Sequence, residues 1–343
     1  PQTSVKLLFL NALLVFYPHK PWPLFRKIFQ LLYEPFELHH NVTPETSSII
    51  EGRNDLLITA MHPHGIIPIH AFIWAAFNDQ YFPSAYGVGS STDAAQYLPV
   101  LRQLLSWLSA GSADRKVLER RMKEEGENLF ILPGGVAEIF LSKRFDPQRD
   151  RKKSEQQQQQ QQESHPSTKG FTHVIKGKRY GLMKLALQTG ALLTPVYVFG
   201  GSEFFDQLAA PSTNQSCEHS IDNDPRSSNS SSKKSIQNQL GYWLERLSRR
   251  IQGGLTFYWG QYGTPLPYKA RLTLVLGDPI IPVPGTEGTE TTGHGKRRCC
   301  RKIPNPTDEQ VQDLMERYVE SLRDLFDTYK GMAGYEYDTI EII

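Results

Sequence analysis

The chain has 343 residues, of which 39% are hydrophobic and 22% charged, enough to bury a substantial core in one large domain or two smaller ones. Its formal net charge of +2 gives no strong attraction to polyanions, so no nucleic-acid partner is expected. Its three cysteines, Cys217, Cys299 and Cys300, fit neither a disulfide framework nor the spacing of a zinc site.

The chain opens with a strongly apolar stretch at residues 5–17. This stretch is too short to span a bilayer by itself, because a spanning helix needs about 20 residues. We expect residues 1–32 to form an apolar, membrane-associated segment that is truncated at its start. An interfacial helix and an ordinary core helix remain alternative interpretations of the same pattern.

Short apolar strands alternate with helices along the rest of the chain. Strands are predicted at residues 56–61, 128–132, 192–199 and 272–276. Helices are predicted at residues 66–77, 93–108, 114–125, 180–189 and 236–251. The clearest helix lies between Thr307 and Gly331, because Thr307 and Gln310 form a capping-box pattern. This alternation predicts an α/β fold in which helices cover a sheet.

Three segments resemble insertions: residues 147–169, 211–235 and 284–302. The first carries charges and a run of glutamines, the second is rich in serine and asparagine, and the third is rich in glycine and threonine. None has enough apolar residues to offset the entropy lost on ordering. We therefore expect mobile loops on one domain rather than linkers between domains.

The first candidate for chemistry is His62-Pro63-His64-Gly65, at the junction of a predicted strand and helix. Loops at strand ends are where α/β proteins place their reacting groups. Histidine suits the removal of a hydroxyl proton, because its pKa lies near neutrality. A carboxylate on the other ring nitrogen would fix its tautomer, and no nucleophile from the protein is needed.

Two alternatives compete with this interpretation. The histidines could be purely structural, or they could chelate a metal, because residues i and i+2 of an extended segment face the same side. Metallohydrolase motifs usually continue with an acid and another histidine. Here those places hold Ile66 and Ile67, so no metal ligand is predicted.

The second candidate is Pro133-Gly134-Gly135, followed by Val136, Ala137 and Glu138. Its glycines allow a ligand to approach the backbone and could offer amide donors to a developing oxyanion. Glu138 is the best candidate for the carboxylate that orients a histidine. Taken alone, the segment is better explained as a turn in which Glu138 begins a helix.

The third candidate begins at Arg179-Tyr180-Gly181 and extends through Gly190 and Pro195 to Phe199-Gly200. Arg179 could hold a phosphate or a carboxylate. In isolation, the block is a packed helix, turn and strand with one surface arginine.

Together, these three blocks resemble the type-2 diacylglycerol acyltransferase family, which includes monoacylglycerol and wax-alcohol acyltransferases. The matching segments lie in the same order, at residues 62–65, 133–138 and 179–200, and a Gly-x-Pro-Ile segment follows at 277–280. The resemblance covers roughly residues 33–330 apart from the insertions. It identifies residues 33–343 as an acyltransferase domain.

The resemblance implies a glycerolipid-acyltransferase-like α/β fold at the endoplasmic reticulum membrane and lipid droplets. It implies acyl-CoA as co-substrate without a further cofactor, and diacylglycerol as the acceptor that becomes triacylglycerol. Related enzymes that act on phosphate-bearing lipids carry an arginine where this chain has Ala137, so a neutral glycerolipid acceptor is expected. No oligomeric state is predicted.

The roles implied for individual residues follow from the same match. His64 is the first choice for the general base, His62 is the fallback, and Glu138 orients the histidine. The expected substrate-binding residues are Gly65, Pro133, Gly134, Gly135, Arg179 and Gly181, with the paired glycines near the oxyanion and Arg179 near CoA. The alternative functions are acylation of monoacylglycerol or a long-chain alcohol, metal-dependent lipid hydrolysis, and lipid binding without catalysis.

Overall fold

The computed structural model describes residues 20–33, 54–141, 171–207 and 256–343, together with a few positions between 243 and 250. The predicted insertions at 147–169 and 211–235 lie outside the described residues, as do residues 1–19 and most of the predicted helix at 236–251. No helix among the described residues combines the length and the apolar composition needed to cross a bilayer.

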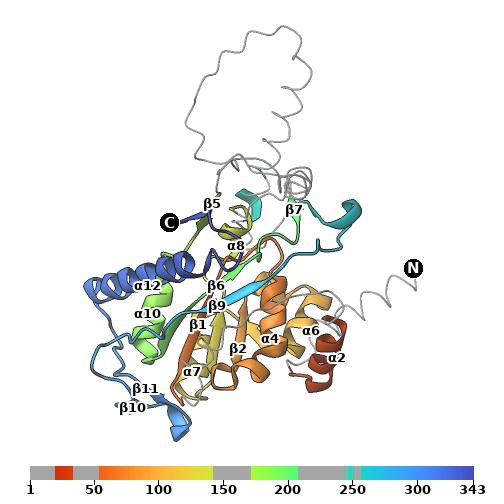
Figure 1. Ribbon diagram of the computed structural model, residues 1–343. Helices are drawn as coiled ribbons and strands as arrows, with labels where there is room; N and C mark the ends of the chain where they lie inside the picture. Colours follow the sequence, from red (N-terminus) through yellow and green to blue (C-terminus); the bar gives the residue numbers. More distant parts are fainter. Residues whose placement is uncertain are drawn as a thin grey trace.

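A six-stranded sheet forms the centre of the fold (Figure 1). Its strand order is β3-β2-β4-β1-β6-β9, in which β9 pairs antiparallel with β6 and the other neighbours pair in parallel. The strands are β1 (Leu57–His62), β2 (Gly87–Ser91), β3 (Ala110–Ser112), β4 (Asn128–Ile131), β6 (Leu192–Phe199) and β9 (Thr273–Leu276). The predicted α/β class is therefore confirmed as a mixed fold with a mainly parallel sheet.

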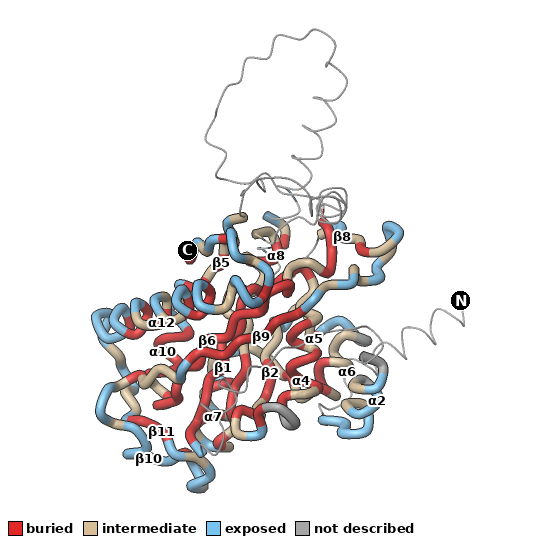
Figure 2. The backbone as a smooth tube through the Cα atoms, in the orientation of Figure 1, coloured by how far each residue is buried: buried red, intermediate tan, exposed pale blue. Residues whose placement is uncertain are grey.

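Helices cover both faces of the sheet, which is why β1 and β6 are buried along their whole length (Figure 2). Ile58 and Ala60 of β1 belong to the core under α7 (Arg115–Lys123), α10 (Tyr180–Thr189) and α12 (Asp308–Tyr329). Leu57 and Met61 point the other way, into the core under α4 (Ile69–Tyr81). Helix α2 (Pro23–Tyr33) packs against α4, and α6 (Pro99–Trp107) packs against α2.

Local sequence signals account for most of these helices. The capping box of α12 is present, with the Thr307 hydroxyl accepting from the Gln310 amide and the Gln310 side chain accepting from the Thr307 amide. Helix α10 ends at Gly190, whose φ of 68° is left-handed, and both α10 and β6 have their predicted bounds.

Two predicted helices differ in the structure, and proline is the reason in both. The helix predicted at 93–108 is wrong as one element, because the chain forms α5 (Asp93–Gln96) and then a new helix, α6, that begins at Pro99. The helix predicted at 66–77 begins later, at Ile69, with Pro68 as its N-cap. Ile66, Ile67 and Pro68 thus lengthen the loop that follows β1.

The segment 284–302 is not the mobile loop that its composition predicted. It contains β10 (Glu290–Thr291) and β11 (Arg298–Cys299), which pair as an antiparallel hairpin. Cys299 and Cys300 are buried there, and the Cys300 amide donates to the Gly190 carbonyl at 2.8 Å. The backbone hydrogen bonds of the hairpin and the burial of these two cysteines stabilise the segment, although it has few apolar residues.

The parallel strands of the sheet all end at one edge, and the elements at this edge position the site. They include α8 (Gly135–Ile139), directly after β4, and the strand pair β5 (Thr172–Ile175) and β12 (Thr339–Ile342) (Figure 1). A second small pair, β7 (Asp206–Gln207) and β8 (Tyr258–Trp259), is tied to α8, because the Gln207 side chain donates to the Ile139 carbonyl. Short 3-10 turns at Pro83–Ala85, Gln261–Gly263 and Gly293–Gly295 complete the described elements.

The contact between the end of α10 and the 284–302 hairpin can be tested with two glycines of similar φ. A Cβ at Gly190 would overlap the Cys300 carbonyl oxygen, whereas a Cβ at Gly285, where φ is 73°, meets nothing within 4 Å. Gly285→Ala should lower the free energy of unfolding by about 1–2 kcal/mol, the cost of a left-handed alanine. Gly190→Ala should lower it by a further ~1–3 kcal/mol, because of overpacking. Equal losses, measured by chemical denaturation, would show that the contact is absent.

Candidate active site

The buried carboxylate of Glu138 organises the loop after β1. Glu138 lies on α8 and is 1% exposed. Its Oε1 accepts hydrogen bonds from His62 Nδ1 at 2.9 Å and from the Lys176 backbone amide at 2.8 Å, and its Oε2 accepts from the His64 backbone amide at 2.6 Å. One side chain therefore connects the end of β1, α8 and the segment after β5.

These donors decide the ionisation of Glu138. Burial raises the pKa of the carboxyl, but the charge of His62 and the hydrogen bonds from His62, His64 and Lys176 lower it by more. The net shift of the pKa is downward, so Glu138 is an anion at neutral pH. A buried anion is tolerated here because N–H donors replace the water that it has lost.

Gly134 and Gly135, which precede Glu138, affect the site in different ways. A Cβ at Gly134 would overlap the carboxyl group of Glu138, so the absence of a side chain there lets Glu138 fold back toward β1. The Gly135 amide donates to the Leu132 carbonyl at 3.3 Å. The Gly135 amide therefore already has a partner within the turn, and the expected role of the two amides toward an oxyanion stays a prediction.

His62 is fully buried, and both of its ring nitrogens are hydrogen-bonded. Nδ1 contacts Glu138, and Nε2 lies 3.1 Å from the hydroxyl of Tyr318, on α12. Nδ1–H donates to the carboxylate, and Nε2 is occupied by its hydrogen bond with the Tyr318 hydroxyl. Both ring nitrogens of His62 are therefore engaged by other side chains of the protein, and its fallback role as the base stays a prediction.

His64 is the half-buried member of the pair. Its Nδ1–H donates to the Gly65 carbonyl at 2.8 Å, and this leaves the lone pair of Nε2 as the basic position. Burial lowers the pKa of His64, outweighing the Gly65 carbonyl and the Glu138 carboxylate, which both raise it. The ring is therefore neutral at pH 7, the state that a general base requires.

The loop that carries His64 packs closely against the turn after β6. Gly65 has a φ of 68°, and a Cβ there would lie 2.7 Å from the Gly201 carbonyl oxygen, so glycine is required on both counts. His70, in the first turn of α4, is fully buried against Gly201. Burial, and to a smaller extent the neighbouring His64, lowers the pKa of His70 to about 3. The His70 ring is therefore neutral where it packs behind the loop.

The remaining predicted site residues come together around one cavity of about 820 Å³ at the carboxyl edge of the sheet. Those that line it are Pro133, Gly134, Gly135, Arg179 and Gly181. The Arg179 guanidinium donates to the Gly134 carbonyl, and the Arg115 guanidinium donates to the Gly181 carbonyl at 2.9 Å. The turn before Glu138 and the start of α10 therefore form a single surface.

Metal binding has no support in the described part of the chain. No group of three or more His, Cys, Asp or Glu side chains gathers there in a way that could hold an ion. The rings of His62 and His64 also hydrogen-bond to different partners, Glu138 and the Gly65 carbonyl.

Sequence reasoning missed two contributors to the site. Tyr318 lies on the apolar face of the last helix, and its spacing there indicates a core residue. The available signal was its hydroxyl, because a buried tyrosine hydroxyl usually has a hydrogen-bond partner. Lys176 contributes through its backbone amide, which carries no residue-specific signal.

Comparison with known proteins places the chain in a family. The family model described as diacylglycerol acyltransferase matches residues 159–343. The diacylglycerol O-acyltransferase 2-like protein 6 of Mus musculus is 28% identical over 337 residues, covering 91% of this chain and 75% of the relative.

Relatives with two different acceptor names show similar identity. Diacylglycerol O-acyltransferase 2 of Dictyostelium discoideum is 26% identical over 81% of this chain and 67% of its own length. The 2-acylglycerol O-acyltransferase 1 of Bos taurus is 28% identical over 81% of this chain and 66% of its own length. No solved structure matches the chain. The family model covers more than half of the sequence, and the chain therefore belongs to the diacylglycerol acyltransferase family, as an acyltransferase of lipid biosynthesis.

Proposed function

We propose that this enzyme transfers the acyl group of acyl-CoA to the free hydroxyl of diacylglycerol, with His64 as the general base. The observation that carries the proposal is the state of His64. It is half-buried and neutral, and Gly65 holds its Nδ1–H, so that Nε2 can accept a proton. The Glu138 carboxylate fixes the position of this loop through the His64 amide.

In the proposed reaction, His64 Nε2 takes the hydroxyl proton as the acceptor oxygen attacks the thioester carbonyl. A new ester bond forms, the C–S bond breaks, and the proton leaves with the CoA thiolate as thiol. Glu138 acts through the loop, because it contacts the His62 ring and the His64 amide rather than the His64 ring. The Gly134 amide is the proposed donor to the oxyanion.

A neutral acceptor is supported by Ala137, which lines the cavity at the position where related phosphate-lipid acyltransferases carry an arginine. Acylation of a monoacylglycerol is the second candidate, because the 2-acylglycerol O-acyltransferase 1 of Bos taurus matches at the same identity as the mouse relative.

We further propose that the enzyme works on a membrane or lipid-droplet surface, at the endoplasmic reticulum. Helix α2 supports this proposal, because Leu24, Ile28 and Leu31 are 56%, 39% and 68% exposed on it. The exposed Lys20 and Lys27 lie on the same segment. Exposed apolar side chains with nearby cations suit an anionic lipid surface.

The acyl-transfer proposal predicts the effect of His64→Ala. Loss of a general base should lower kcat by about 10²–10⁴-fold, measured with labelled oleoyl-CoA and a panel of diacylglycerol, monoacylglycerol and long-chain alcohol. The thermal midpoint of unfolding should hardly change, because within the described part of the chain the His64 ring hydrogen-bonds only to the neighbouring carbonyl. His62→Ala should lower both kcat and the thermal midpoint, because it removes a buried partner of Glu138 and Tyr318.

Three results would contradict this account. Full activity of His64→Ala would show that His64 is not the general base. Acyl release without any acceptor, abolished by a chelator, would indicate a metal-dependent hydrolase. Binding of acyl-CoA with no turnover on any acceptor would indicate a lipid-binding protein.

The surface proposal predicts the behaviour of α2 in a flotation assay with liposomes that contain anionic lipid. Leu24→Ser combined with Leu31→Ser should reduce the floating fraction, because both variants remove apolar area from an exposed face. Met332→Ser is the control, since Met332 is exposed to a similar extent at the far end of α12. Flotation of the double variant at the level of the unmodified chain would overturn the proposed role of α2. A tagged full chain in cells should colocalise with endoplasmic reticulum and droplet markers, and a cytosolic distribution would contradict that location.

A further inference from the structure

The segment 335–343, which follows α12, returns to the edge of the sheet beside β5 and α8 (Figure 1). Its strand β12 pairs in parallel with β5. Beyond this pair, the Lys178 amide donates to the Ile343 carbonyl at 3.2 Å. Lys176, whose amide donates to Glu138, lies between β5 and Lys178. The segment therefore holds the backbone on both sides of a donor to Glu138.

The carboxylate of Asp338 fixes the start of this strand pair. Its Oδ1 accepts from the Phe171 backbone amide at 2.9 Å, and its Oδ2 lies 2.8 Å from His173 Nε2. His173 Nδ1 lies 3.1 Å from the hydroxyl of Tyr197, which is the partner of His62 in the pairing of β1 with β6. Asp338 thus connects β12 to β5 and, through the His173 ring, to the strand beside His62.

The hydroxyl of Tyr335 contacts the site from a second direction. It donates to Glu203 Oε1 at 2.8 Å. Burial, and then the charge of Glu203, raises the pKa of Tyr335, so the hydroxyl keeps the proton that it donates. Glu203 belongs to the turn after β6, in which Gly201 packs so closely on Gly65 that a Cβ there would lie 2.7 Å from the Gly201 carbonyl oxygen. Tyr335 therefore holds the turn against which the loop of His64 packs.

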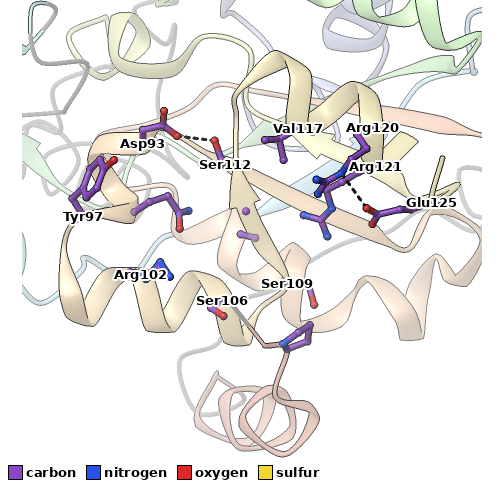
Figure 3. Close-up of a pocket in the computed structure, with 14 residues that line it drawn as sticks. Asp93, Tyr97, Arg102, Ser106, Ser109, Ser112, Val117, Arg120, Arg121 and Glu125 are labelled. Carbon is purple, nitrogen blue, oxygen red and sulfur yellow. Dashed lines mark hydrogen bonds and ion pairs between the residues drawn. The ribbon is translucent and has the colours of Figure 1, made fainter. Parts of the chain in front are cut away.

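A carboxylate at the β3 edge of the sheet shows how the Asp338 contact differs from a surface contact. Asp93 lines a cavity of about 600 Å³ there and accepts from the Ser112 hydroxyl at 2.7 Å (Figure 3). That hydrogen bond is exposed, so water competes for both of its partners. The side chains of Asp338 and His173 are only 11% and 13% exposed, and Phe326 of α12 lies 5.5 Å from the His173 ring between centroids. The Asp338 contact is therefore much the stronger constraint on geometry.

We propose that Asp338 and Tyr335 are positioning residues for acyl transfer, which hold Glu138 and the loop of His64 from two directions. The inference rests on the proposed function, because it assigns both residues to the reaction at His64. Asp338 acts through β5 and the Lys176 amide, and Tyr335 acts through the turn after β6. Loss of either contact shifts Glu138 or the base relative to the thioester, and small misplacements of reacting groups are costly in rate.

Asp338→Asn tests the first contact in the full chain. An amide side chain has one acceptor oxygen, so it cannot accept from both the Phe171 amide and the His173 ring. The kcat of acyl transfer should fall by about 10–100-fold, with the KM for oleoyl-CoA changed by about twofold or less, because geometry is lost and binding is kept. Hydrogen exchange, followed by mass spectrometry, should become faster in the peptides that contain Lys176 and His64 and stay unchanged in β4.

Glu341→Gln is the matched control, since Glu341 is an exposed carboxylate on the same strand as the segment's backbone pairing. It should leave kcat and exchange unchanged. A Glu138→Gln background tests the route of the effect. Because Asp338 acts through Glu138, Asp338→Asn should change kcat by only about twofold or less in that background. The same fold-loss in both backgrounds would show that Asp338 is merely structural and would overturn its proposed role.

Tyr335→Phe tests the second contact and keeps the aromatic ring, which lies 5.4 Å from Phe199 and 5.7 Å from His173 between centroids. The variant should therefore fold. Its kcat should fall about tenfold, the effect of one lost hydrogen bond to a charged group. Exchange should become faster in the peptide that contains His64 and stay unchanged in the peptide that contains Lys176.

Unchanged kcat and unchanged exchange in both variants would overturn the inference. A fall in kcat without faster exchange at His64 would overturn it as well, and so would exchange that rises equally in every strand, the mark of a general loss of stability. The exchange measurement does not depend on turnover. Faster local exchange in the variants, combined with no acyl transfer by the unmodified chain, would support the two contacts and reject the transferase reaction. Acyl transfer by the unmodified chain, combined with unchanged kcat and exchange in the variants, would reject the inference alone.

Discussion

The site depends on one buried negative charge. The Glu138 carboxylate accepts hydrogen bonds from the His62 ring and from the backbone amides of His64 and Lys176. Removing such an anion from water is costly unless donors replace its hydration, and these three groups do so. The requirement for a small residue at Gly134, where any side chain would meet Glu138, follows directly from this arrangement.

The position of the Glu138 carboxylate places His62 and His64 in different environments. His62 is enclosed by Glu138 and Tyr318 and connects β1 to α12, whereas His64 donates only its backbone amide to the carboxylate, and its Nε2 is the proposed basic position. The usual acid–histidine relationship, in which the carboxylate holds the ring of the base, is therefore not the one found here. The Gly65 carbonyl fixes the tautomer of His64 instead.

Sequence alone predicted the elements whose signals are local. The capping box of α12 and the left-handed glycine after α10 are examples, and the His-Pro-His-Gly and Pro-Gly-Gly blocks correctly indicated which loops meet at the sheet edge. The pairing of β5 with β12 could not be predicted in this way, because these short strands lie more than 160 positions apart. The enclosure of His62 could not be predicted either, because Tyr318, the partner of its Nε2, is 256 positions away.

The most direct test of the central claim is the pH dependence of kcat/KM for acyl transfer in the unmodified enzyme and in Glu138→Gln. Burial lowers the pKa of His64, and a base works only when deprotonated, so activity should persist as the pH falls through 6.5 and decline only below it. The negative charge of Glu138 raises the pKa of His64, so its removal should move this decline to still lower pH while kcat falls. A decline centred at or above 6.5, unchanged in Glu138→Gln, would contradict the account.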